Sequence, residues 1–195
     1  MASKYFLASA LVLSFLIATT ALPKTTDSLG VTVHEWGTLT SVAGTNGSAM
    51  PWRTFGGPSD LPCFVESFGG FKGGLYAFVR METPVLYFYG SRDFTADVNV
   101  RFPNGTITEW FPKADLTRSY DAIEWRNVRI SPNAVLQLPD GGSSHYFTAR
   151  ETDAAPLQVG SQSEKFLFYR GVGNFPVPIS AKVADDGKLE VKNLG

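Results

Sequence analysis

The sequence predicts an all-β protein, an antiparallel β-sandwich of the jelly-roll or immunoglobulin-like type with little helix outside an N-terminal signal peptide. The chain contains 19 Gly, 12 Pro and 13% aromatic residues, a mixture typical of short strands joined by tight turns. Apolar residues form short runs between turn residues, and no long helical pattern follows the N-terminal segment. Many short strands without intervening helices favour an antiparallel sandwich or barrel, and we expect the sandwich.

Residues 1–21 have the residue order of a secretory signal peptide. Lys4 precedes an apolar stretch at 5–17, and small residues follow at 18–21. Cleavage is expected after Ala21, which leaves 22–30 as a linker. The alternative is a membrane anchor, but the apolar stretch is shorter than the roughly 20 residues of a spanning helix. We therefore expect an exported protein, periplasmic or extracellular, with no stable transmembrane span after cleavage.

The first half of the folded region begins with a strand and a long loop. A strand is expected at 31–42, and repeated Gly and Pro residues make 44–74 loop-like, as in functional or mobile segments. The strongest strand pattern lies at 75–89. Pro84 within it marks a bulge, an edge or a break between two strands, because proline cannot donate to the strand ladder.

The second half is expected to consist of strands and turns. Pro103-Asn104-Gly105 lies between the runs 98–102 and 106–111, and Asn-Gly in this setting predicts a hairpin. Residues 86–89 and 166–169 are apolar on both faces, which is typical of the central strands of two packed sheets. Further strands are expected at 123–130, 135–138, 145–150, 164–169 and 177–183.

The domain organisation is simple. We expect one β-sandwich domain at 31–184, and we expect 185–195 to begin a further hairpin or domain. Residues 187–193 alternate polar and apolar side chains directly after the turn at 185–187. Two interpretations are kept open for this pattern, a short C-terminal edge strand and a truncated part of a longer protein.

Charge and cysteine content exclude several classes of protein. The formal net charge is −1, so neither a nucleic acid nor a polybasic membrane site is expected as a partner. Cys63 is the only cysteine, which excludes an internal disulfide. We expect Cys63 to be a small buried hydrophobic residue and not a nucleophile. Stability must then come from the aromatic β core or from a bound ion.

Two histidines are the only candidates for a metal site. His34 and Trp36 share one face of the first predicted strand, and Glu35 lies on the other. If His34 and His145 converge, a carboxylate from Glu35, Glu151 or Asp153 completes three ligands for a divalent metal with an open position for water. The spacing matches no known ligand motif, so we favour structural histidines and expect no cofactor otherwise.

Three Glu-Trp pairs, at 35–36, 109–110 and 124–125, are the main candidates for ligand contact. The simple interpretation places each tryptophan in the core and each glutamate outside. The alternative is a sugar-binding face in which Trp36, Trp110 and Trp125 stack on sugar rings. If the strands carrying Glu109 and Glu124 pair with each other, two carboxylates at suitable separation would permit glycoside hydrolysis.

Arginines near the predicted strand ends offer a second kind of site. Arg80, Arg150 and Arg170 either pair with partly buried carboxylates or together form a pocket for an anionic ligand. We favour the ion pairs, because they are ordinary at the rims of sheets.

The segment 34–44 (His-Glu-Trp-Gly-Thr-Leu-Thr-Ser-Val-Ala-Gly) resembles the opening of a group of uncharacterised exported bacterial proteins. The resemblance continues at 80–85, 109–112 and 164–171, so it covers about residues 33–183. The group has no assigned activity, fold or ligand. It implies a bacterial envelope or extracellular setting and, because its members are longer, agrees with the truncated interpretation of the C-terminus.

Together these observations favour an exported, non-catalytic binding or interaction module whose ligand is a glycan or an envelope protein. No phosphate loop, nucleophile elbow or zinc-protease helix occurs in the sequence. The competing class is a metal-assisted hydrolase using His34, His145 and a nearby carboxylate. A third is a purely structural domain of a larger secreted protein.

Overall fold

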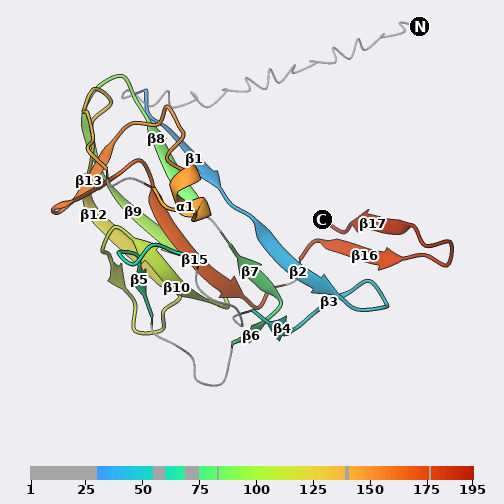
Figure 1. Cartoon of the computed structure of the whole chain (residues 1–195). Helices are drawn as coiled ribbons and strands as arrows, with labels where there is room; N and C mark the ends of the chain where they lie inside the picture. The colour runs from blue at the N-terminus through green and yellow to red at the C-terminus, as the bar shows by residue number, and fades with distance from the viewer. Residues whose placement is uncertain (1–29, 55–59, 69–74, 83, 139–140, 176) are drawn as a thin grey trace, which may run out of the picture.

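The structure is a computed structural model that describes residues 30–54, 60–68, 75–82, 84–138, 141–175 and 177–195 (Figure 1). The expected signal peptide at 1–21, and the linker up to residue 29, lie outside the described residues. In the described part strands dominate, the strands of every sheet pair in the antiparallel sense, and one four-residue helix occurs. The prediction of an all-β, antiparallel chain is therefore confirmed.

The larger sheet contains eight strands. Two of its lines each consist of two successive strands with a break between them. The first line is β1 (Thr32–Trp36) followed by β2 (Leu39–Ala43), and the second is β7 (Val79–Met81) followed by β8 (Val85–Tyr89). β1 pairs with β8 and β2 with β7, while β15 pairs with both β7 and β8. Pro84 lies between β7 and β8, so it marks a break between two strands. The remaining strands are β3 (Ala49–Met50), β5 (Glu66–Ser67), β10 (Gly105–Phe111) and β15 (Leu167–Gly173).

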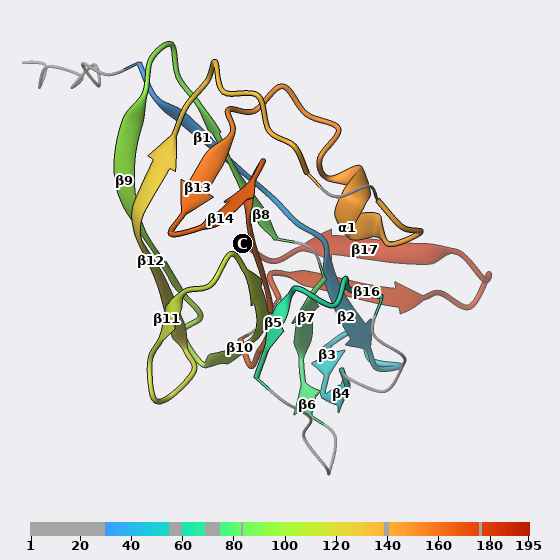
Figure 2. The same ribbon diagram turned by 60° about the vertical axis from the view of Figure 1, so that its left-hand side comes forward.

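The smaller sheet contains five strands built around one long strand, β12 (Ala122–Ile130). β12 pairs with β9 (Phe94–Arg101), β11 (Asp115–Leu116) and β13 (Leu157–Val159), and β13 pairs with β14 (Gln162–Glu164). Two further pairs complete the architecture: β4 (Trp52–Arg53) with β6 (Tyr76–Ala77), and β16 (Ile179–Val183) with β17 (Leu189–Asn193). The second pair forms a hairpin that extends away from the rest of the chain (Figures 1 and 2).

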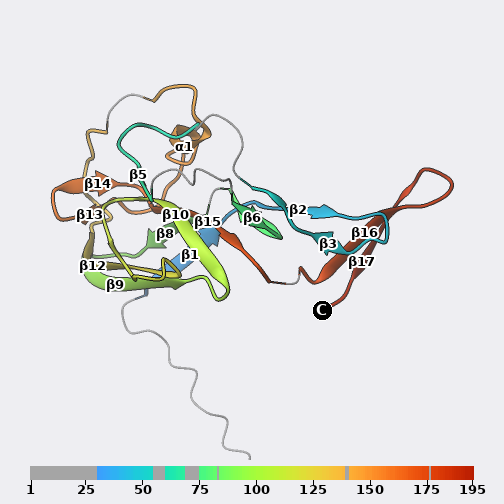
Figure 3. The ribbon, with the colours of Figure 1, turned by 90° about the horizontal axis from the view of Figure 1, so that it is seen from below.

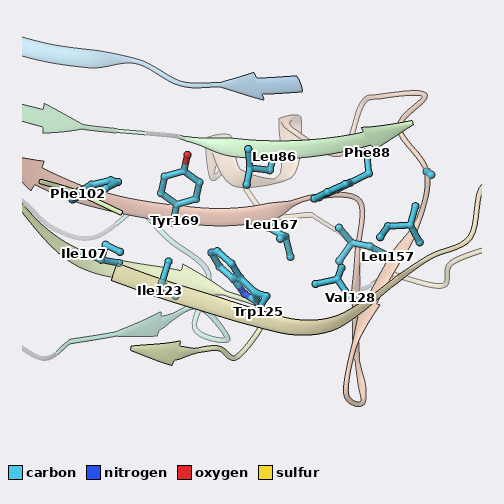
Figure 4. Close-up of a cluster of buried hydrophobic side chains, with 12 residues drawn as sticks. Leu86, Phe88, Phe102, Ile107, Ile123, Trp125, Val128, Leu157, Leu167 and Tyr169 are labelled. Atoms are coloured by element: carbon cyan, nitrogen blue, oxygen red, sulfur yellow. The ribbon is translucent and has the colours of Figure 1, made fainter. Parts of the chain in front are cut away.

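The main core lies between the larger and the smaller sheet (Figure 4). Leu86 and Phe88 of β8 and Leu167 and Tyr169 of β15 face the smaller sheet, where Trp125 is completely buried. Because side chains alternate along a strand, one face of each sheet supplies this core. Four of the twelve buried residues of this core are aromatic, and the others are aliphatic.

A second core covers the opposite face of the larger sheet. Tyr87 and Phe168 point to this face and pack against Tyr146 of the helix α1 (His145–Thr148) and against Phe64. Figure 3 shows α1 and the segment with β5 on one side of β15, with β9 and β12 on the other. The prediction that 86–89 and 166–169 are central strands is confirmed. The prediction that they belong to two different sheets is wrong, because β8 and β15 are neighbours in one sheet.

The turn at 103–105 is present, but the predicted hairpin is wrong. Asn104 adopts a positive φ of 57°, and the Gly105 N–H donates to the carbonyl of Phe102 at 2.9 Å. However, β9 pairs with β12 in the smaller sheet, while β10 pairs with β15 and β5 in the larger sheet. The turn thus carries the chain from one sheet to the other. Phe102 lies buried in the core between the sheets, which separates the two strands.

Other local expectations are also corrected. The segment expected as a strand at 145–150 contains α1, because Ser144 caps it by accepting the Tyr146 N–H at 3.1 Å. Residues 135–138 form no strand, and Val135 is 93% exposed. Cys63, expected to be buried, is exposed. The boundary expected between 184 and 185 falls in the turn of the β16–β17 hairpin.

Candidate binding cleft

A cleft of about 600 Å³ lies on the face of the larger sheet that points away from the smaller sheet. It runs from the β1 edge across β8 and β15 and is bounded on one side by α1. Its lining is aromatic at one end and charged at the other. The residues used below are Trp36, Thr38, Thr40, Asp60, Glu82, Tyr87, His145, Tyr146, Phe168 and Arg170.

The segment 36–38 forms one wall because the first line of the sheet is interrupted there. Trp36 ends β1 opposite Val85, and its side chain is 68% exposed. A Cβ atom at Gly37 would lie 3.1 Å from the Cα of Pro84, a tight contact that glycine avoids. The Thr38 carbonyl accepts the N–H of Glu82 at 2.8 Å. These contacts fix the backbone next to Trp36, whose side chain lines the cleft.

The opposite wall is α1, which hydrogen bonds hold on the sheet. The Tyr87 hydroxyl donates to the carbonyl of Ala149 at 2.7 Å, and the Tyr146 hydroxyl donates to the Glu164 carboxylate at 3.0 Å. Glu164 is fully buried and also accepts from Nε and Nη2 of Arg150, at 3.0 and 2.7 Å. Burial and the nearby Glu164 charge raise the pKa of Tyr146 well above its ordinary value. Tyr146 is therefore a neutral hydrogen-bond donor.

The charged end of the cleft is organised by Arg170, which is only 3% exposed. Its Nε donates to the backbone carbonyl of Glu82 at 2.7 Å, and both terminal nitrogens lie 3.2 Å from Oδ1 of Asp60. The Glu82 carboxylate lies 3.4 Å from both the Arg80 Nε and the Thr40 hydroxyl. Asp60 and Glu82 keep partly exposed carboxylates, 48% and 31% accessible. The groups that a ligand meets here are thus mainly acidic.

Glu109 lies behind this end, directly opposite Arg170 in the β10–β15 pair. Burial raises the pKa of Glu109 above its ordinary value, while the Thr108 hydroxyl and the positive charges of Arg170 and Arg80 act in the opposite direction. Glu109 does not line the cleft. Its half-buried side chain lies on the strand next to Arg170.

The three predicted stacking tryptophans are in different environments. Trp36 is exposed at the cleft, Trp110 is partly buried against the main core, and Trp125 is completely buried and donates its indole N–H to the Pro112 carbonyl at 2.9 Å. Trp125 is therefore a core residue, and the prediction that it contacts a ligand is wrong. In the first pair both residues are exposed, so Trp36 is not inside, and Glu35 on the other face of β1 accepts a hydrogen bond from the Tyr169 hydroxyl.

The three predicted arginines contact three different carboxylates and do not form one anion pocket. Arg150 pairs with buried Glu164, Arg170 pairs with Asp60, and Arg80 lies beside Glu82. This arrangement matches the ion-pair interpretation, and only Arg170 of the three lines the cleft.

The predicted metal ligands lie on different elements and faces. The His34 ring packs against Tyr89, with the ring centroids 5.1 Å apart, whereas Glu35 points to the other face of β1 and His145 lies on α1 at the cleft. Glu151 and Asp153 follow α1 and are exposed. Within the residues that the structure describes, no three His, Cys, Asp or Glu side chains gather as metal ligands.

The proposed pair of catalytic carboxylates is wrong. Glu109 is in the larger sheet and Glu124 in the smaller, where Glu124 lies opposite Asp115 and binds Arg126 at 2.6 Å. Sequence reasoning missed Asp60, Thr38 and Thr40 as cleft residues. Asp60 lies in a loop with no motif, and Glu82 was not predicted as a site residue.

Comparisons with known proteins do not identify a family for this chain. In the described part of the chain, α1 is the only helix, and it is far too short to cross a membrane. No protein-family model, no curated protein and no solved structure matches this chain.

Proposed function

We propose that this chain is an exported bacterial protein whose two facing sheets form a β-sandwich, and that the sandwich is a non-catalytic module that binds a carbohydrate in the cleft. The observation that carries the proposal is the position of Trp36. Its indole is 68% exposed at a cleft that also contains the carboxylates of Asp60 and Glu82. An exposed indole at a cleft offers an apolar surface that a ligand can cover.

The chemistry of the cleft suits a sugar. The C–H face of a pyranose ring is apolar and packs on an aromatic ring, while its hydroxyl groups need hydrogen-bond acceptors and donors at fixed positions. Trp36 supplies the aromatic surface, Asp60 and Glu82 supply acceptors, and the hydroxyls of Thr38 and Thr40 can do both. A purely apolar ligand would displace water from the two carboxylates without replacing the hydrogen bonds that the water made to them.

The charge of the cleft predicts which sugars bind best. Arg170 already contacts Asp60 and the Glu82 backbone and is almost fully buried, so its positive charge is largely compensated within the protein. The exposed charges are those of Asp60 and Glu82. We therefore expect neutral or amino sugars to bind better than uronic acids, because a sugar carboxylate would meet like charges.

The test is a titration of the purified protein with soluble oligosaccharides of three kinds: neutral hexoses, amino sugars and uronic acids. Calorimetry gives the affinity, and tryptophan fluorescence reports whether the exposed indole is covered. Trp36→Ala should weaken binding at least tenfold, which corresponds to about 1.4 kcal/mol. Glu82→Gln should weaken it less, because one acceptor oxygen remains.

Tyr76→Ala is the matched control. Tyr76 is 62% exposed, close to the value for Trp36, but lies on β6 and does not line the cleft. Its replacement should leave sugar affinity unchanged. Equal affinity of wild type and Trp36→Ala, with the control also unchanged, would refute the carbohydrate proposal. Binding of a peptide panel in place of sugars would favour a protein ligand for the same cleft.

Export and metal-assisted hydrolysis are tested separately. When the full chain is produced in a bacterial host, mass spectrometry of the exported protein should give an N-terminus at Leu22. Material retained in the cytoplasm at full mass would contradict export. For the hydrolase alternative with His34, His145 and a carboxylate, metal analysis of the purified protein and of His145→Ala is the direct experiment. Stoichiometric zinc that the substitution removes would favour it.

A further inference from the structure

The hairpin of β16 and β17 has an exposed apolar face. Ile179, Val183, Leu189 and Val191 are between 48% and 71% exposed, and the strand register places all four on the same face. The other face is polar and contains the ion pair between Lys182 and Glu190, 3.2 Å apart. An isolated two-stranded hairpin is only marginally stable in water, so this element is a natural site for an additional strand.

Hydrogen bonds at the hairpin reveal which backbone groups point outward. The Ala184 N–H donates to the Lys188 carbonyl at 2.8 Å, so the even-numbered residues of the two strands bond to each other. The Ala181 N–H donates instead to the Gly47 carbonyl at 3.1 Å, beside the β2–β3 turn. The odd-numbered residues of β16 therefore point away from β17, and by the same alternation the odd-numbered residues of β17 point away from β16.

The outer edge of β17 thus presents the N–H and C=O groups of Leu189, Val191 and Asn193. Among the described residues β17 pairs only with β16, and all of its residues are exposed. The hairpin extends from the body with β16 nearer to β2 and β17 on the outer side (Figure 1). A free strand edge of this kind is a template for another strand.

We propose that the added strand is β17 of a second copy of this chain, paired antiparallel with Val191 on the two-fold axis. In this register Val191 bonds to the partner's Val191, and Leu189 bonds to the partner's Asn193. Glu190 then lies opposite the partner's Lys192, and the same pair forms again across the axis. These are non-hydrogen-bonded positions, where opposite side chains approach most closely.

Charge selects this register over its neighbours. A shift of two residues in one direction places Glu190 opposite the partner's Glu190, and in the other direction Lys192 opposite the partner's Lys192. Both alternatives put like charges at close cross-strand positions, which is unfavourable. Charged residues often protect an exposed edge by repulsion, but here their alternation makes the edge complementary to itself.

The proposal does not depend on the carbohydrate cleft, which lies on the larger sheet. The first test is sedimentation velocity of the purified protein over a concentration series. Wild type should form a concentration-dependent dimer, and Lys192→Glu should weaken dimerisation at least tenfold, because Glu190 would face the partner's new carboxylate. The double variant with Glu190→Lys and Lys192→Glu restores opposite charges across the axis and should dimerise again.

A control and a local readout complete the test. Lys113→Glu makes the same change in net charge on a distant exposed position and should dimerise like wild type. Amide exchange by NMR should show concentration-dependent protection of Leu189, Val191 and Asn193, which Lys192→Glu abolishes. A protein that stays monomeric up to its solubility limit overturns the proposal. So does a dimer without this protection, which would mean that the copies meet through the apolar face instead.

Discussion

Replacing Glu164 by Gln tests whether the buried ion pair under α1 holds the cleft together. Glu164 is completely buried, and its oxygens accept two hydrogen bonds from the Arg150 Nε at 3.0 and 3.1 Å and one from its Nη2 at 2.7 Å. The Tyr146 hydroxyl at 3.0 Å and the Lys165 N–H at 2.8 Å complete the set. Among these partners only the Tyr146 hydroxyl can also accept, so the amide nitrogen of Gln would meet donors from Arg150 and from the Lys165 backbone.

The magnitude follows from the burial of both partners. Arg150 is only 13% exposed, and its guanidinium lies 5.0 Å from the ring centre of Phe147, so water cannot replace the lost charge. Removing one partner of such a pair costs about 3–5 kcal/mol, a large part of the roughly 5–15 kcal/mol that stabilises a typical domain. We expect Glu164→Gln to lower the free energy of unfolding by this amount.

Glu124→Gln is the matched control. Glu124 binds Arg126 at 2.6 Å, almost the distance of the buried pair, but its partner is 61% exposed. Because water replaces the contact, the loss should be below about 1 kcal/mol. Urea unfolding followed by tryptophan fluorescence gives both free energies, with the slope showing whether the denatured state has changed.

Two results would refute the reasoning. One is a loss below about 1 kcal/mol for Glu164→Gln, which would mean that water reaches Arg150. The other concerns the double variant Glu164→Leu with Arg150→Met, which removes both charges. It should be more stable than either single variant, because the cost lies in the unpaired charge and not in the missing pair. A fully additive loss contradicts this. Glu164→Gln should also weaken sugar binding, since α1 forms a wall of the cleft.

Three further predictions use the same unfolding assay. Burial raises the pKa of Tyr146 and Tyr169 above the unfolded value of about 10. Their contribution to the free energy of unfolding is therefore present below that pH and is lost as the pH rises beyond it. Tyr169→Phe should reduce this alkaline loss of stability. Burial raises the pKa of Glu109, so Glu109→Gln should increase stability at pH 7, and the increase should disappear where acid protonates the wild-type carboxyl. Gly171→Ala would place a Cβ atom 2.5 Å from a backbone oxygen and should cost roughly 1–3 kcal/mol, whereas Gly142→Ala, with space around it, should cost little.

The sequence predicted some local features correctly, but it did not determine which strands pair. Pro84 predicted a bulge, an edge or a break because proline lacks a donor, and Asn104 predicted a tight turn because it tolerates a positive φ. Neither residue determines which strand lies alongside. At 103–105 the burial of Phe102 between the sheets directs β9 and β10 to different partners, β12 and β15. The second core explains the other wrong pairing. β8 and β15 are apolar on both faces because one face packs in the main core and the other in the second core, so the two strands can be neighbours in one sheet.

The same limit explains why only part of the cleft was predicted. Trp36 was singled out as an aromatic residue, but its exposure depends on Gly37 approaching Pro84 and on Thr38 bonding to Glu82, far along the chain. Glu35 meets its partner Tyr169 at a separation of 134 residues. Within the segment 34–38 each residue therefore makes its own contact with a different part of the larger sheet. A strand pattern alone predicts that Glu35 and Trp36 lie on opposite faces, as they do, but it does not show that one face offers the Tyr169 hydroxyl to the carboxylate or that the other opens into a cleft.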